Sequence, residues 1–293
     1  MADYKHTLVK DGRGGQIPFP PFITQREMDI VSDKFIVQAD DIFIVTFPRS
    51  GTTWMEQVIH LLLNYGEQGS KVLGDAVPWV ETLPNRAQGF KKFLEEMTGR
   101  RLFTSHLPYS LMPGRHNSSA RFVYVARNPK DVAVSTYHHD RSKHGYEGSW
   151  EEHFNLFIEG KVMFGSYFNH VLPWWEAARQ KDNILFVKYE DMKQDMKGVI
   201  AKLADFLQID TDNELIDEVI EKSSFGTMAN NSQTNLNWVP QKKGIPGHFR
   251  KGEIGDWRNH FSHEQTRIFD ALYMERMAGT GLQFDFGNGV VLP

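Results

Sequence analysis

The chain has 293 residues, 40% of them hydrophobic and 13% aromatic, so it can build the large core of an α/β fold as one domain. Its 33 Lys and Arg against 37 Asp and Glu give a formal charge of −4, which argues against nucleic acid or an anionic membrane as a partner. The absence of cysteine excludes disulfides, cysteine nucleophiles and thiolate metal sites. Any phosphate site must therefore be a local concentration of positive charge.

The N-terminal region carries no sign of a membrane or secretory segment. Residues 1–10 lack an apolar signal core, and no run approaches the roughly 18 apolar residues of a membrane span, so we expect a soluble, cytoplasmic protein. Residues 1–25 are rich in Gly and Pro and are predicted to form an extended arm over a single domain comprising residues 1–293. A short helix and a polar turn are expected over residues 26–41.

Residues 42–63 are predicted to form a strand, a tight loop and a helix. Ile42 to Thr46 favour a strand, and apolar residues recur at helical spacing from Trp54. Between them Gly51 lets the backbone approach a ligand, and Ser50 and Thr52 are suited to cap the helix. Amides at such a helix end would bind phosphate, although an ordinary well-capped turn fits the same residue types. No GxxxxGK[ST] motif occurs, which argues against ATP hydrolysis.

Three further apolar runs predict buried strands, at residues 101–105, 122–126 and 184–189. A turn or helix signal follows each run, so the predicted fold is α/β, with a central parallel sheet flanked by helices. Ligands of such sheets bind beyond the carboxyl ends of the strands. A short helix is expected at 90–97, and aromatic-rich helices at 149–165 and 167–180 are predicted to form core rather than ligand contacts.

Candidate functional residues follow the predicted strands. His106 comes directly after the second strand and could take a proton from a hydroxyl, although its position alone fits a structural histidine better. Arg127 after the third strand and Ser135 in the next helix could bind one phosphate together. The turn formed by Arg250 and Lys251, with glycines beside it, could clamp an anion or simply be solvated.

These segments resemble the cytosolic sulfotransferases, which use 3′-phosphoadenosine 5′-phosphosulfate (PAPS). TFPRSGTTW resembles the family's 5′-phosphosulfate loop, although the family usually has Tyr-Pro-Lys where this chain has Phe47-Pro48-Arg49. SHLP, VYVARNPKDVAVS, VKYEDM, SSF and RKGxxGDW follow in the family's order, so the resemblance spans roughly residues 40–275. The RKGxxGDW motif is the most specific of them.

The resemblance implies transfer of a sulfuryl group from PAPS to a hydroxyl of a small phenol or alcohol, with PAP as product and no metal. His106 would be the general base, and Arg49 would stabilise charge on the departing 5′-phosphate. Phe225 would stack on the adenine opposite Trp54. The cofactor would contact Arg49, Ser50, Gly51, Thr52, Thr53, Trp54, Arg127, Ser135, Tyr189, Ser223, Phe225, Phe249, Arg250, Lys251 and Gly252.

The chain departs from the family at the acceptor side. Thr104 and Ser105 stand where the family has Lys-Thr, which removes one of two usual cations near the sulfuryl group. Trp79, His106 and His139 are the predicted acceptor contacts. The polar residues 138–141 replace aromatic ones, so either they point to solvent or they favour a compact polar acceptor over a steroid.

The family's C-terminal dimer segment is also altered. Where many members have Lys-x-x-x-Thr-Val-x-x-x-Glu, this chain has Arg258, Ser262, His263 and Arg267, so we expect a monomer, or a dimer that does not use residues 258–267. Two other functions stay open at this stage. One is a P-loop nucleotide kinase, and the other is a non-catalytic nucleotide-binding protein of the same fold.

Overall fold

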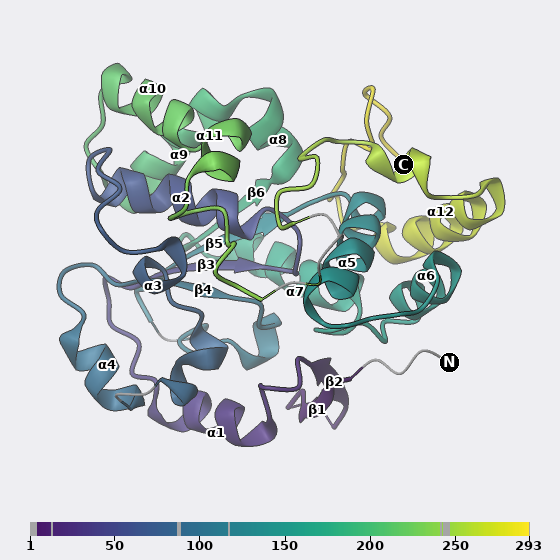
Figure 1. Ribbon diagram of the computed structural model, residues 1–293, viewed down its shortest axis with the longest axis horizontal. Helices are drawn as coiled ribbons and strands as arrows, with labels where there is room; N and C mark the ends of the chain where they lie inside the picture. Colours follow the sequence, from purple (N-terminus) through teal and green to yellow (C-terminus); the bar gives the residue numbers. More distant parts are fainter. Residues whose placement is uncertain are drawn as a thin grey trace.

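Four parallel strands form the central sheet of the computed structural model, which describes residues 5–12, 14–86, 89–116, 118–240, 242 and 247–292. Their order is β4 (Leu102–Ser105), β3 (Ile42–Thr46), β5 (Arg121–Ala126) and β6 (Ile184–Lys188) (Figure 1). The predicted strands are confirmed, except that Tyr189 begins a helix instead of ending β6. Their carboxyl ends lie level, because Val45 pairs with both Ser105 and Tyr124.

The two faces of the sheet are both apolar but differ in kind. Successive side chains of a strand point to opposite faces, so Phe43, Phe103 and Phe122 share one face, where their rings stack at centroid distances of 5.2–5.4 Å. Ile44 and Val123 belong to the aliphatic cluster on the other face. Since neither face meets water, each strand is a continuous apolar run, as parallel sheets require.

Helices cover both faces (Figure 1). The aliphatic cluster includes α2 (Thr52–Leu63), α9 (Met196–Leu207) and α10 (Asn213–Lys222), and the aromatic cluster includes α1 (Gln25–Lys34) and α7 (Tyr167–Gln180). The remaining elements are α3 (Leu73–Ala76), η1 (Val80–Asn85), α4 (Phe90–Glu96), η2 (Tyr109–Leu111), α5 (Pro129–Lys143), α6 (Trp150–Ile158), α8 (Tyr189–Gln194), α11 (Phe225–Asn230), η3 (Asp256–Asn259) and α12 (His263–Met277).

The predicted end of one helix is wrong, and the N-terminal arm pairs with itself. Helix α6 ends at Ile158 rather than near residue 165, because Gly160 and Phe164 adopt positive φ angles of 68° and 66° that turn the chain out of the helix. The N-terminal arm is a hairpin, in which β1 (Thr7–Lys10) pairs antiparallel with β2 (Gln16–Phe19). The amide of Phe164 donates to the carbonyl of Pro18 at 2.7 Å and so ties this hairpin to the domain.

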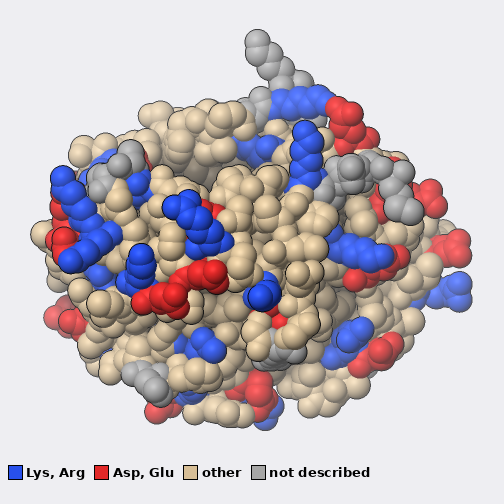
Figure 2. Space-filling model, turned by 90° about the horizontal axis from the view of Figure 1, so that it is seen from below, with Lys and Arg blue, Asp and Glu red and all other residues tan. Residues whose placement is uncertain are grey.

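Charge is spread over the surface. On the face seen in Figure 2, Lys and Arg side chains are intermixed with Asp and Glu side chains, in keeping with the small formal charge of −4. Within the described part of the chain, no helix combines the length and apolar character that crossing a membrane would take.

Candidate functional site

A cavity of about 580 Å³ opens beyond the carboxyl ends of β3, β4 and β5. Its walls come from the loop before α2, the ends of β4 and β5, helix α5 and residues 248–253. Every predicted site residue except Ser50 lines this cavity, and Ser50 is buried directly beneath it in the loop. Segments about 200 residues apart in the sequence are thus brought to one place.

The loop before α2 is built differently from the predicted capped turn. The N-cap is Gly51, at a φ of 108°, and no side chain in the described part of the protein caps the first turn of α2. The predicted capping by Ser50 and Thr52 is therefore wrong. A Cβ at residue 51 would lie 2.9 Å from the ring of Tyr189, so only glycine fits this turn. The first amides of α2 are left for an anion.

Several buried polar atoms around the cavity have no hydrogen-bond partner among the described residues. On the predicted nucleotide-binding residues they are Ser50 Oγ, Trp54 Nε1, Arg127 Nε and Ser223 Oγ. The Arg127 guanidinium is otherwise fixed, since Nη2 donates to the carbonyl of Glu253 at 2.7 Å and the group lies 4.4 Å from the ring centroid of Tyr189. Buried polar atoms without partners usually await a ligand or water, so these atoms suit a polar, anionic molecule.

Acidic side chains hold the basic segment in position. Arg250 and Lys251 donate to Asp256 at 2.6 and 2.5 Å. Burial raises the pKa of Asp256, but hydrogen bonds from Lys251, Asn259 and Arg250 outweigh it and hold the pKa well below its usual range. At Gly252 a Cβ would lie 2.6 Å from the ring of Phe225. The glycine thus allows the backbone to pass close to the aromatic wall.

Aromatic rings wall the side of the cavity predicted for adenine. Trp54 lies edge-on to Tyr189 with centroids 5.4 Å apart, and Phe225 lies edge-on to Phe249 at 5.5 Å. Tyr189 is fixed by its hydroxyl, which donates to the carbonyl of Gly252 at 2.9 Å. Trp54 and Phe225 both face the same space, as a base stacked between them would require.

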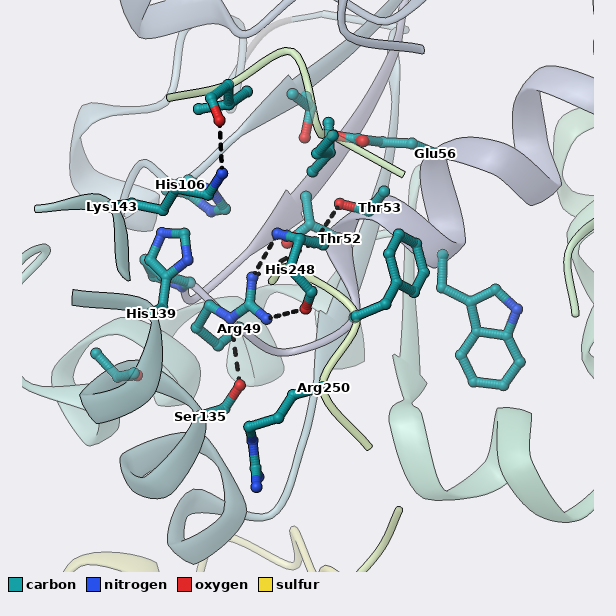
Figure 3. Close-up of a pocket in the computed structure, with 18 of the residues that line it drawn as sticks. Arg49, Thr52, Thr53, Glu56, His106, Ser135, His139, Lys143, His248 and Arg250 are labelled. Atoms are coloured by element: carbon teal, nitrogen blue, oxygen red, sulfur yellow. Dashed lines mark hydrogen bonds between the residues drawn. The ribbon is translucent and has the colours of Figure 1, made fainter. Parts of the chain in front are cut away.

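Arg49 lies at the centre of the cavity (Figure 3). Its Nε donates to Ser135 Oγ at 3.2 Å, its Nη2 donates to the carbonyl of His248 at 3.0 Å, and its Nη1 lies 2.8 Å from the Nδ1 of the same imidazole. Burial, and then the nearby charges of Arg127 and Arg250, lower the pKa of Arg49 to about 10. The guanidinium remains charged at neutral pH and is directed toward α5 and residue 248.

His106 is held as a neutral imidazole. Its Nδ1 lies 3.0 Å from the carbonyl oxygen of Thr46, which can only accept, so the proton sits on Nδ1 and the lone pair on Nε2. The backbone amide donates to Glu81 at 2.6 Å, and the rings of Trp79 and Phe164 lie 5.4 and 5.3 Å away. Burial lowers the pKa of His106 to about 4. A neutral, oriented imidazole is a competent proton acceptor.

The end of α5 carries polar groups into the cavity. His139, Lys143 and His144 line it, with His139 and His144 centroids 5.2 Å apart (Figure 3). The Lys143 ammonium donates to the carbonyl of Val239 at 2.8 Å. His138 does not reach this space but packs on His260 at 5.1 Å. Of the two alternatives for residues 138–141, pointing to solvent therefore does not hold for His139, which lines the cavity where the acceptor is predicted to bind.

Sequence reasoning missed several cavity residues. His248 lies 6.2 Å from the ring of His139 and bonds Arg49, Phe164 covers His106, and Glu56 lines the cavity from α2. Glu56 had a visible signal, since it lies one helical turn after Thr52 on a predicted ligand-facing side. Phe164 had none, because its role depends on where α6 ends.

Comparison with known proteins agrees with this geometry. Residues 39–281 match the family model described as the sulfotransferase domain. The chain is 38% identical to sulfotransferase 1C2 of Rattus norvegicus over 260 residues, covering 85% of this chain and 87% of that protein. It belongs to the family of cytosolic PAPS-dependent sulfotransferases. Sulfotransferase 2A2 of Mus musculus is 37% identical and covers 90% of this sulfotransferase.

Solved structures give the same assignment. The structure of mouse sulfotransferase SULT7A1 complexed with PAP matches 91% of this sulfotransferase and 93% of its own chain, with a TM-score of 0.74 and 31% identity. Retinol dehydratase in complex with retinol and PAP matches 93% of the chain and 90% of its own at a TM-score of 0.82, and at 24% identity it supports the fold. The predicted α/β fold and enzyme class are confirmed.

Proposed function

We propose that this sulfotransferase binds PAPS in the cavity and transfers the sulfuryl group to a hydroxyl of a small-molecule acceptor. The observation that carries the proposal is that the phosphate loop and the free Nε2 side of His106 open onto one cavity. The unpartnered Ser50, Arg127 and Ser223 atoms suit the phosphates, and the space between Trp54 and Phe225 suits the adenine. Bound PAPS supplies the sulfuryl group, and its product PAP would leave the same site.

Each step of the proposed mechanism uses a group of this chain. Nε2 of His106 accepts the proton of the acceptor hydroxyl as that oxygen becomes the nucleophile. Arg49 and the amides at the start of α2 stabilise negative charge at the phosphate loop. Thr46 contributes by orientation, since its carbonyl fixes the His106 ring and its hydroxyl lies 2.7 Å from that of Thr52.

The acceptor side combines an apolar wall and a polar wall. Trp79 and Phe164 flank His106, and Phe22 lies edge-on to Trp79 at 5.9 Å. The polar groups of His139 and Lys143 line the same cavity. An aromatic or alicyclic alcohol with further polar groups would satisfy both walls, whereas a steroid would leave the polar wall unpaired at about 1 to 3 kcal/mol per group.

Ligand-induced stabilisation tests the nucleotide assignment. PAP should stabilise the protein in the presence of EDTA, by about 2.7 kcal/mol at 100 times its Kd, and Mg-ATP should not. Stabilisation by Mg-ATP alone would favour a nucleotide kinase. A non-catalytic protein would bind PAP but fail to sulfate a panel of phenols and alcohols with labelled PAPS, which makes turnover the deciding measurement. Unchanged turnover in EDTA is expected, because the proposed steps use no metal.

A further inference from the structure

Glu56 is a buried acid whose role the mechanism above leaves open. It lies in α2, is 7% exposed, and lines the cavity shared by Arg49 and His106. Among the described residues no cation pairs with its carboxyl group. The Thr104 hydroxyl lies beside the carboxyl group of Glu56. This hydroxyl makes no hydrogen bond of good geometry with any described residue.

The position of Glu56 relates it to both the phosphate loop and the strand that precedes the proposed base. It lies one helical turn after Thr52, on the same side of α2 as the phosphate loop. Thr104, its neighbour, is near the end of β4, two residues before His106. The Thr52 hydroxyl is linked through Thr46 to His106. Glu56 therefore lines the same cavity as the phosphate loop and the proposed base.

An ionised carboxylate at this place would oppose the bound nucleotide. The phosphosulfate is an anion, and like charges in a desolvated cavity repel strongly. Burial raises the pKa of Glu56 to about 7, with the Thr104 hydroxyl lowering it in part, so the neutral form is readily populated. A neutral carboxylic acid can donate a hydrogen bond to an anion.

We propose that Glu56 carries a proton when PAPS is bound and donates it in a hydrogen bond to the phosphosulfate end, beside Thr104, where related enzymes carry a lysine. The proton stays on Glu56 throughout, so no bond to it is made or broken by the transfer. This inference rests on the proposed function. It gives the site a hydrogen-bond donor in place of the missing charge.

Other charged groups face the same cavity from every element around it. They are Arg49 in the loop, His106 after β4, Arg127 after β5, His139, Asp140, Lys143 and His144 in or just after α5, Lys193 in α8, and His248, Arg250, Lys251 and Glu253 in the C-terminal segment. None of them contributes to the pKa shift of Glu56, which arises from burial and Thr104 alone. Its titration can therefore be isolated by substitution.

The test measures PAPS affinity without acceptor, by calorimetry from pH 6 to pH 8, in wild type, Glu56→Gln and Glu253→Gln. Below pH 7 Glu56 is already protonated. Above pH 7 Glu56 is largely ionised and must take up a proton when PAPS binds. The Kd of the wild type for PAPS should therefore rise about tenfold from pH 6 to pH 8. Glutamine keeps a neutral donor and should remove this rise. Any titration of PAPS itself affects all three proteins equally, so it cancels when they are compared. Glu253→Gln, the control, should show the same dependence of Kd on pH as the wild type.

Proton uptake gives an independent readout. At pH 7 the wild type should take up about half a proton more per PAPS than Glu56→Gln, measured in buffers of different ionisation enthalpy. Glu56→Ala, which lacks the donor, should bind PAPS at least tenfold more weakly than Glu56→Gln at pH 6.

The possible results distinguish the role proposed for Glu56 from the proposed sulfotransferase function on which it rests. Equal pH slopes and equal proton uptake in wild type and Glu56→Gln, with PAPS still bound, would overturn the role of Glu56 alone. That result would also be expected if the carboxylate stays ionised to meet a cationic acceptor. Failure of all variants to bind PAPS at any pH would overturn the proposed function together with the inference.

Discussion

The two ends of the cavity recognise their ligands by different means. At the nucleotide end, Arg250 and Lys251 form ion pairs with Asp256, which hold the two side chains in position. At the acceptor end, burial and then the charge of Arg49 hold the pKa values of His139 and His248 well below their usual range. One end thus presents ion-paired cations, and the other presents neutral imidazoles beside the ammonium group of Lys143.

Arg49 joins the two ends. It bonds Ser135, which is predicted to bind a phosphate together with Arg127, and it bonds His248, which lies beside His139. Burial first, and the central charge of Arg49 second, lower the pKa values of the neighbouring His139 and His248. Substitutions at the centre should therefore affect chemistry, and substitutions at either end should affect one ligand.

Replacing His106 should have the largest effect. His106→Ala removes the proposed base, so turnover should fall about 10²- to 10⁴-fold while PAP affinity stays near that of wild type. Steady-state kinetics and calorimetry measure the two separately. The control is His116→Ala, an exposed histidine that should leave both unchanged. Wild-type turnover in His106→Ala would remove this residue from the mechanism.

Substitutions of Arg49 test whether the positive charge at the centre of the cavity is needed for turnover. Arg49→Ala should lower kcat more than it raises the KM for PAPS, because charge stabilisation is needed most in the transition state. Arg49→Lys keeps the charge and should retain most of the activity. The loss on Arg49→Ala should reach about tenfold or more, and an alanine variant with wild-type kcat would contradict a catalytic role for Arg49.

The sequence predicted the nucleotide end better than the acceptor end. The four strands are short apolar runs ended by turn signals, so their carboxyl ends and residues such as Arg127 could be located from pattern alone. His248 could not, because its contact with Arg49 joins residues 199 positions apart. The N-cap at Gly51 was also missed, since a ligand-binding loop leaves amides unpaired that a capping rule would satisfy.

His248 offers a way to change acceptor preference. His248→Phe replaces a polar wall by an apolar one, so kcat/KM for a simple phenol or a steroid alcohol should rise relative to that for a polar alcohol, by about three- to tenfold. In the wild type a steroid preferred by tenfold or more over the polar alcohol would defeat the polar-acceptor proposal. The control is His116→Phe, which should not alter the ratio.

The smallest effect is expected at the C-terminal segment of residues 258–267, none of which lines the cavity. Arg258 donates to the carbonyl of Gly287 at 3.0 Å and lies 4.7 Å from the ring centroid of Trp257, and Ser262 caps α12 by accepting from the amide of Gln265 at 3.1 Å. The side chains of Arg258 and Ser262 therefore already bond to groups of their own chain. His263 and Arg267 are exposed and would place like charges across a two-fold axis.

We therefore expect no dimer through residues 258–267. Light scattering should give the same mass for wild type and Arg267→Glu, with the same turnover, because an exposed charge outside an interface contributes little. If a dimer does form, replacing Ser262 and His263 together shows whether its interface contains this segment. Loss of the dimer in that variant would show that the segment pairs after all, whereas its persistence would place the interface on another surface.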